Sequence, residues 1–574
     1  MEQRPFMDRN QLIGFALIGV ILLGTSFWAS TVEPSEPKKS AQSKEVQAAS
    51  TPAAEAELDY ALPPGDSASP EQEFTLENDQ VRYVISNKGA QIKSVELKEY
   101  QDWQGNPLML VDGNQVLDGP SSAVAFAASY EGRSLSLSDN LGSVWTYELP
   151  AEGYGLRWSM STPSKKDIVL TWRQAGIRHE KSQMNEATNT SIYYLENADM
   201  ERGSLSDGSD DEESEENLGW VAHRQQYFSS ILQAESGFVK ADMQTRTPSD
   251  TLHSRLFESK LRMASVDGKV SAKGIWYHGP NHYKTLKDFN LEFDQVIPFG
   301  WGIFGWIGKY VVSPMFNWLD GYGLNYGIII LLMAALIKLA LSPLTFRSYK
   351  SMAKMRVLKP EIDELNEKFK DAEPAKKQQE TIALYQKAGV NPLGGCIPQL
   401  LSLPILIAMF RFFPISIELR QQSFLWADDL SSYDSILSLP FEIPFYGAHV
   451  SLFTLLMAIS TFLYTKFNNS MTPTSGNSMM QQQMMIIQYL MPFMLLVWFN
   501  NYSSGLSYYY FISNVLTFGQ QWVIKEFVID ENAIRAKIDE TKAKGGSQSR
   551  FAKKMSEMLE VQKEAGNRKA RRGK

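Results

Sequence analysis

The feature that most constrains this fold is a series of long apolar runs in the second half of the chain. Residues 328–346, IIILLMAALIKLALSPLTF, carry one charge among 19 positions. Membrane-length runs cover about 324–346, 393–413, 450–467, 484–499 and 506–524. A helix of about 20 apolar residues crosses the hydrocarbon core of a bilayer. The sequence therefore predicts an α-helical core with five membrane spans, within residues 294–530.

The N-terminal segment predicts an anchor followed by a linker. Residues 1–30 contain a long apolar run preceded by Arg4 and Arg9, which indicates a signal-anchor transmembrane helix. Cleavage after this run stays open, because small residues follow Trp28. Residues 31–73 are rich in Pro, Ala, Ser and Glu, a composition typical of a disordered linker.

Residues 74–293 predict a domain of a different class. Short runs such as SVWTYEL and IVLTWRQ alternate apolar and polar side chains, and turn residues separate them. Many short strands without alternating helices favour an antiparallel β-sandwich. The acidic run SDGSDDEESEEN at 206–217 is expected to form a solvated loop. The predicted fold class is thus a multidomain membrane protein, with a β-sandwich domain and a helical core.

The distribution of Lys and Arg orients the predicted spans. Segment 347–392 holds ten basic residues and the segment from 525 onwards holds fourteen, whereas 414–449 holds only Arg420. Loops that are rich in Lys and Arg stay on the cytoplasmic side. Both termini are therefore predicted to be cytoplasmic, and the β-sandwich domain is predicted to lie on the far side of the membrane, which in bacteria is the periplasm.

Three segments surround the predicted spans. Residues 297–319 are aromatic and glycine-rich with little charge, which suits a helix at the membrane surface. The sequence of residues 347–389 predicts a cytoplasmic helical hairpin with a break near Pro374. This hairpin is either a solvated connection or a docking site for partners. Residues 531–574 predict a basic cytoplasmic tail, which suits contact with RNA, the ribosome or anionic lipid, or serves solubility alone.

Polar side chains recur inside the predicted spans. They are Lys338, Ser342 and Thr345, then Gln399 and Ser402, then Gln488, and in the last span Ser507, Tyr510, Asn514, Thr517 and Gln521. Spacing of three or four residues places each set on one helix face. Polar groups in hydrocarbon need partners. The stripes indicate interhelical hydrogen bonds or a hydrated cavity, and Lys338 either faces that cavity or extends its amine to the headgroups.

Other sequence features limit the function. The interior of the five C-terminal spans has no Asp or Glu, which disfavours a proton or cation pump. The chain has no phosphate-binding glycine loop and no nucleophile elbow, and its histidines are scattered, so we expect neither an enzyme nor a cofactor. A lipid or small-solute transporter remains an alternative, although no internal repeat supports it. A binding module anchored by the spans is a third possibility.

Four motifs resemble the YidC/Oxa/Alb family of membrane protein insertases. They are SMAKMRVLKPEI at 351–362, GVNPLGGCIPQLLSLPI at 389–405, ELRQQSFLWADDLS at 418–431 and SSGLSYYYFISN at 503–514. The resemblance covers about 300–530. The first helix, the β-sandwich and GWVAHRQQYF at 219–228 are similar to the bacterial form of the family.

The resemblance implies a function and a set of site residues. Family members insert and help to fold nascent inner-membrane proteins, alone or with the Sec translocon, through a hydrophilic groove open to the cytoplasm. The groove usually carries an arginine five residues before Pro-Leu-Thr, where this chain has Lys338. Tyr509 and Tyr510 match paired tyrosines that contact the client. The β-domain is expected to be a β-super-sandwich.

The resemblance also implies partners. These are nascent membrane proteins, the Sec translocon (SecYEG and SecDF), the ribosome and signal recognition particle pathway, and membrane lipids. On the cytoplasmic hairpin, the candidate contact residues are Tyr349, Met352, Lys354, Met355 and Arg356. No cofactor is implied.

Overall fold

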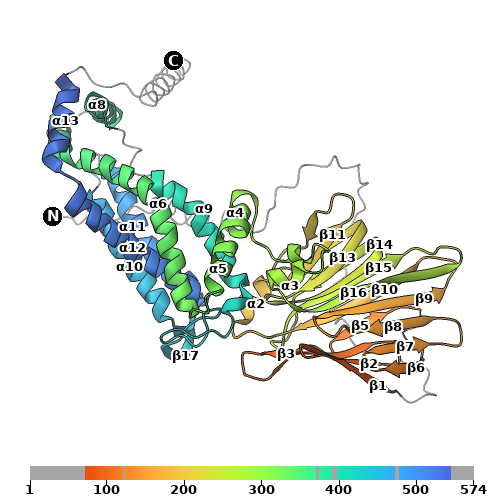
Figure 1. The fold of residues 1–574 in the computed structure, drawn as a ribbon. Helices are drawn as coiled ribbons and strands as arrows, with labels where there is room; N and C mark the ends of the chain where they lie inside the picture. Colours follow the sequence, from red (N-terminus) through yellow and green to blue (C-terminus); the bar gives the residue numbers. More distant parts are fainter. Residues whose placement is uncertain are drawn as a thin grey trace, which may run out of the picture. The chain divides into compact units, whose positions relative to one another are not determined.

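The computed structural model describes residues 71–120, 122, 124–369, 374–390, 397–471 and 478–543 (Figure 1). The predicted signal-anchor at 1–30, nearly all of the predicted linker, and the tail beyond residue 543 lie outside the described residues. The chain divides into two units, Met1–Trp301 and Gly302–Lys574. This division falls close to the predicted boundary between residues 293 and 294.

The first unit is built from antiparallel β-strands, as the alternating runs predict. A four-stranded sheet has the order β1-β2-β3-β4, and a twelve-stranded sheet contains the path β12-β11-β13-β14-β16-β9-β8-β7-β6. The strands are β1 (Glu73–Glu77), β2 (Val81–Ser86), β3 (Ile92–Gln101), β4 (Pro107–Asp112), β5 (Gln115–Asp118), β6 (Ala127–Glu131), β7 (Ser134–Ser138), β8 (Val144–Glu148), β9 (Gly155–Pro163), β10 (Ile168–Ile177), β11 (Ser191–Glu196), β12 (Arg202–Ser204), β13 (Asp211–Arg224), β14 (Phe228–Arg246), β15 (His253–Met263) and β16 (Lys269–Pro280). The β-sandwich prediction is confirmed.

Large aromatic side chains fill the core of this β-unit. Trp172, Trp220 and Trp276 are each at most 1% exposed. The Trp172 ring stacks on His223 with 3.6 Å between the ring centroids, and the edge of Trp276 meets Trp172. Each buried aromatic removes a large apolar area from water, which is the main driving force for forming this core.

The prediction of a loop at 206–217 is wrong for most of that run. Residues Asp211–Glu216 belong to β13 and pair with Thr245–Lys240 of β14. Side chains of a strand alternate between its two faces, and here they alternate between half-buried and exposed, so the carboxylates remain solvated although the backbone is paired. Strand pairing with β14 therefore overrides the low β-propensity of acidic residues.

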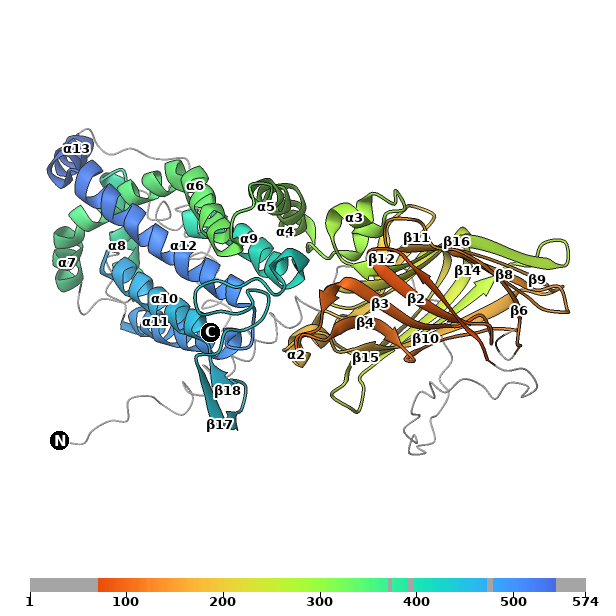
Figure 2. The same cartoon turned by 60° about the horizontal axis from the view of Figure 1, so that its bottom comes forward.

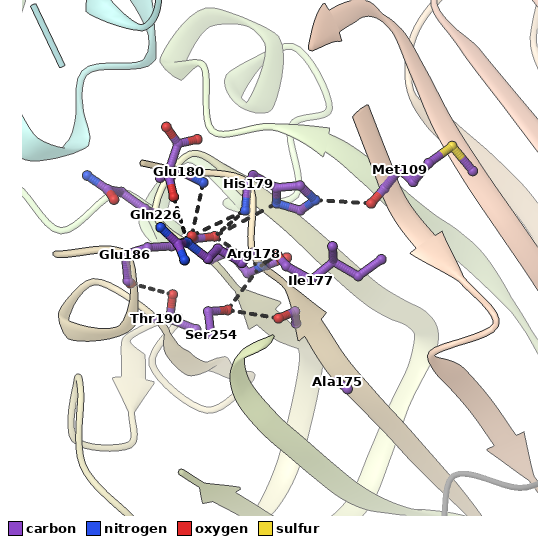
Figure 3. Close-up of polar contacts among 12 residues, drawn as sticks. Met109, Ala175, Ile177, Arg178, His179, Glu180, Glu186, Thr190, Gln226 and Ser254 are labelled. Carbon is purple, nitrogen blue, oxygen red and sulfur yellow. Dashed lines mark hydrogen bonds and ion pairs between the residues drawn. The ribbon is translucent and has the colours of Figure 1, made fainter. Parts of the chain in front are cut away.

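A buried carboxyl group fixes the connection between β10 and β11. Glu186 lies in the short helix α2 (Gln183–Thr188) and is 1% exposed. Its carboxyl oxygens accept hydrogen bonds from the backbone N–H groups of His179, at 3.1 Å, and Glu180, also at 3.1 Å (Figure 3). The Gln225 amide donates a third, at 3.4 Å. Burial, reinforced by the Glu180 charge, outweighs these donors and raises the pKa of Glu186 to about 8.

We expect the Glu186→Gln variant to lose a pH dependence of stability that the native chain shows. The Glu186 carboxyl binds its proton more tightly in the folded state than at the ordinary value of 4.5. The free energy of unfolding should therefore fall as pH rises from about 4.5 to about 8, and it should then level off. The size of the fall is on the order of 1.4 kcal/mol for each unit by which the folded and unfolded pKa values differ. Thermal unfolding of the full chain, followed by tryptophan fluorescence at several pH values, tests this. Parallel profiles for the two proteins would contradict it.

The second unit is mainly helical. Its helices are α4 (Gly302–Ile307), α5 (Ser313–Asp320), α6 (Tyr326–Val357), α7 (Lys359–Lys368), α8 (Pro374–Lys387), α9 (Ile397–Phe412), α10 (Leu452–Met471), α11 (Ser478–Phe499), α12 (Ser504–Val523) and α13 (Glu531–Ala543). A π-helical turn at Gly308–Val312 joins α4 to α5, and another at Ile524–Val528 follows α12. The helix α3 (Tyr283–Lys287) precedes this unit, and strands β17 (Leu437–Ile443) and β18 (Gly447–Val450) form a hairpin within it.

The structure changes the predicted boundaries of the span at 324–346 and of the hairpin at 347–389. Helix α6 continues from the apolar run through Val357, so the first arm of the predicted hairpin is an extension of the spanning helix. The break comes at Leu358, directly before Lys359-Pro360, because proline suits only the first turn of a new helix. Pro374 instead begins α8.

One described helix, α6, is long and apolar enough to cross a membrane. Shorter apolar helical stretches occur at Ser402–Ile415, Leu452–Phe467 and Tyr489–Phe499. Each coincides with part of a predicted span. The number of five spans remains a prediction.

Candidate functional site

An open pocket of about 410 Å³ lies between α6 and the end of α12. Its lining residues are Ser342, Pro343, Phe346, Gln520, Val523 and Ile524. Two of these are polar and four are apolar, so the lining is less hydrophilic than the resemblance implies. Pro343 lacks an N–H group and cannot donate to the carbonyl one turn before it, which weakens α6 beside the pocket.

Lys338 lies one helical turn before Ser342 and is half-buried. Its backbone carbonyl accepts a hydrogen bond of 3.4 Å from the Gln520 side chain, which connects α6 to α12 at the pocket. Among the described residues, no carboxylate or other charged group interacts with the Lys338 ammonium. Lys338 thus has no counter-ion within the described part of the chain, and its backbone contacts Gln520 of the pocket lining.

Two residues of the polar stripe on α12 face α10. The Asn514 amide donates to the hydroxyls of Ser460, at 3.1 Å, and Thr461, at 2.9 Å. Ser507 is fully buried and shares a hydrogen bond of 3.0 Å with Thr454. These two residues serve interhelical hydrogen bonding, which was one of the two interpretations left open for the stripe.

The other predicted residues occupy varied positions. The Thr345 and Thr517 hydroxyls bond to carbonyls of their own helices, at Leu341 and Ser513. Tyr509 is 3% exposed and its ring lies 5.7 Å from that of Phe413, whereas Tyr510 is half-buried. Ser402 is half-buried on α9. The side chains of Gln399 and Gln488 lie outside the described part of the structure.

The structure thus brings together only part of the predicted groove. Lys338 and Ser342 are adjacent to the pocket, but Ser507 and Tyr509 are enclosed by protein. Sequence reasoning did not identify Phe346, Gln520, Val523 and Ile524. Three of these are apolar or aromatic, and such residues in a membrane helix give no signal that distinguishes a pocket lining from contact with lipid.

The predicted hairpin residues pack against a helix from the C-terminal segment. Met355 is buried in an apolar cluster with residues from α7, α8 and α13. Tyr349 packs with Ile524, and Met352 contacts both this pair and the apolar cluster around Met355. Arg356 forms an ion pair of 3.2 Å with Glu531, and Lys354 is half-buried. This end of α6 is a packed structure and not a free arm.

Helix α13 completes that cluster, and the prediction of a basic cytoplasmic tail at 531–574 did not include this packing. Ile534 and Ile538 are 8% and 2% exposed and point into the cluster. Glu361 of α7 pairs with Arg535 at 3.0 Å and with Lys542 at 2.5 Å. The spacing of the two isoleucines by one turn, in an otherwise charged segment, was the available sequence signal.

Comparison with known proteins identifies the family. A model described as 60Kd inner membrane protein matches residues 318–532, and one described as YidC periplasmic domain matches 159–314. A Parabacteroides distasonis protein named membrane protein insertase YidC is 34% identical over 97% of this chain and 98% of its own length. The protein of that name from Amoebophilus asiaticus is 35% identical over 97% of this chain and 99% of its own length.

One solved structure is also similar. The crystal structure of an active YidC insertase, with its first transmembrane domain resolved, is 19% identical and covers 82% of this chain and 96% of its own, with a TM-score of 0.33. The sequence relationship to the curated relatives extends over nearly the full length of both chains. This chain therefore belongs to the YidC family of membrane protein insertases.

Proposed function

We propose that this protein inserts nascent membrane proteins through the pocket between α6 and α12, with Lys338 as the residue that attracts acidic groups of the client. The observation that carries the proposal is a half-buried ammonium, without a charged partner among the described residues, one turn from an open pocket. A charge inside a membrane segment costs about 2.5–3.5 kcal/mol on insertion scales, so such a residue is a functional candidate.

The mixed lining of the pocket suits this role. A short polar segment of the client meets Ser342, Gln520 and the Lys338 charge, while its apolar helix contacts Phe346 and Val523. Transfer of that helix from the pocket into lipid is favourable by about 0.8 kcal/mol for each CH₂ removed from water. The client's own hydrophobicity then drives insertion, and no nucleotide is required.

The proposal includes a placement in the membrane. The β-unit lies in the periplasm, the core crosses the inner membrane five times, and both termini are cytoplasmic. Support comes from the basic residues of the 347–392 segment and of the segment after residue 525. On the cytoplasmic side, the cluster of α6, α7, α8 and α13 offers a surface to the ribosome and the signal recognition particle pathway, and the Sec translocon acts as a partner in the membrane.

Site-specific photo-crosslinking tests this function. A photoreactive amino acid replaces Phe346, Tyr510 or Met352, and ribosome-bound nascent chains with one hydrophobic segment are presented to the protein in vesicles. We expect crosslinks from Phe346 and Tyr510 that follow the hydrophobic segment. Leu463, 54% exposed on α10 and outside the pocket lining, is the matched control position. Equal crosslinking from Leu463 and Phe346 would refute the pocket as the client site.

A further inference from the structure

The β17–β18 hairpin exposes an apolar surface that the insertion mechanism does not use. Leu437 is 56% exposed, Phe441 61% and Phe445 93%. Apolar side chains recur at every second position of β17, and Glu442 is the only carboxylate between residues 435 and 450. A two-stranded hairpin is at best marginally stable in water. Its exposed apolar side chains therefore indicate that another apolar phase covers it.

The hairpin is nevertheless held in a defined position. The Asn500 amide donates to the carbonyls of Tyr446 and His449, both at 2.9 Å. Asn501 also donates to Tyr446, at 2.9 Å. The His449 ring stacks on Tyr433 with 3.9 Å between centroids. Strand β18 is thus fixed to the connection between α11 and α12, and among the described strands β17 pairs with β18 alone.

Both ends of the hairpin meet at the first turn of α10. Asp434, before β17, accepts hydrogen bonds from the backbone N–H groups of Leu452, at 2.8 Å, and Phe453, at 3.1 Å. Ser451, after β18, donates to the same carboxylate at 2.5 Å. The hairpin therefore projects from the N-terminal end of a predicted spanning helix, so it lies next to where that helix leaves the hydrocarbon.

The segment between α9 and α10 contacts the starts of α6 and α12, and these contacts show which helix ends lie beside the hairpin. Asn325, at the start of α6, donates to the Ser423 carbonyl at 3.1 Å, and Gly505, at the start of α12, donates to the Leu430 carbonyl at 2.9 Å. The starts of α6, α10 and α12 thus lie at one end, with β17 and β18, away from α7 and α13 (Figures 1 and 2). The apolar part of α6, residues 326–346, is about 30 Å long, close to the hydrocarbon thickness.

We propose that the β17–β18 hairpin inserts its exposed apolar edge into the membrane leaflet at this end of the helices, as a second membrane contact. Continuity with the ends of the membrane helices favours lipid as the occupant. The edge strand carries Pro440, and Pro444 follows it. Neither residue can donate a backbone hydrogen bond, which disfavours pairing with a strand of a partner protein. Aromatic side chains such as Phe441 and Phe445 fit the boundary between headgroups and acyl chains.

The single cysteine of the chain makes a direct test practical. In a Cys396→Ala background, an environment-sensitive fluorophore is attached at Phe445→Cys or Phe441→Cys. Leu141→Cys, 78% exposed in the β-unit, is the aqueous control, and Ser438→Cys on the same strand is the control for the other strand face. The full-length protein is reconstituted alone into phosphatidylethanolamine–phosphatidylglycerol vesicles, and quenching by aqueous iodide and by nitroxide-labelled lipid is compared.

We expect labels at 445 and 441 to show blue-shifted emission, strong quenching by the lipid probe and weak quenching by iodide, with the reverse at 141. Iodide quenching at 445 and 441 as strong as at 141 would overturn the proposal. Protection that arises only in native membranes, and not in vesicles of the purified protein, would identify a protein partner and also overturn it. The inference rests on the membrane placement proposed above. Client insertion measured in the same vesicles reports the proposed function separately, so the two can fail independently.

Discussion

We expect the Lys338→Met variant to insert clients that carry acidic residues beside their hydrophobic segment about tenfold more slowly than the native protein, or slower still. Two unit charges about 8 Å apart attract by about 2 kcal/mol at an effective dielectric constant near 20, and 1.4 kcal/mol corresponds to a tenfold change in rate. Met is similar to Lys in length and removes only the charge and the hydrogen-bond donors of the side chain. The measurement is the rate of protease-protected insertion into vesicles of purified protein.

Two variants control for effects other than the charge of Lys338. Lys338→Arg keeps the charge and should retain most of the activity, although guanidinium and ammonium donate hydrogen bonds differently. Lys350→Met removes an exposed charge from the same helix, outside the pocket lining, and should leave the rate nearly unchanged. The effect of Lys338→Met should also vanish for clients without acidic residues. Full activity of Lys338→Met toward acidic clients would refute the proposed role of Lys338 in attracting the acidic groups of the client.

The Ile538→Asp variant should release α13 from its apolar cluster with α6, α7 and α8. Ile538 is 2% exposed among Met355, Ile362 and Tyr385. An ionised carboxylate without a partner in an apolar cluster is strongly unfavourable, by several kcal/mol. A helix of 13 residues is marginal in water by itself, so α13 should lose its helical structure when it loses its packing.

Hydrogen exchange measured by mass spectrometry checks this expectation. Peptides covering 531–543 should lose nearly all protection, and peptides of α7 and α8 should lose part of theirs, because α13 covers both helices. Ala536→Asp is the matched control, since it introduces the same charge at an exposed position of the same helix. Retained protection in Ile538→Asp would mean that the ion pairs of Glu361 with Arg535 and Lys542 alone hold α13 in place.

The sequence determined the class of each unit, because periodicity is a local property. Alternation of apolar and polar residues with period two indicated the β-unit, and the length of the apolar run indicated α6. Both patterns can be read within a short stretch of sequence, without knowledge of the rest of the chain. The position of Lys338 beside a polar face was also readable, since residues four apart share one side of a helix. The break at Leu358 is also a local property, because Pro360 fits only the first turn of a new helix.

Only the tertiary structure decided which polar residues face a pocket and which bond to a neighbouring helix. Ser507 and Asn514 share a stripe with Thr517, but Ser507 and Asn514 form hydrogen bonds with α10. Their partners lie about 50 positions away in the sequence. The acidic strand at 211–216 likewise forms because β14 pairs with it, and α13 is anchored by residues of α6, α7 and α8. Such pairings are set by packing between distant segments, which local propensity does not encode.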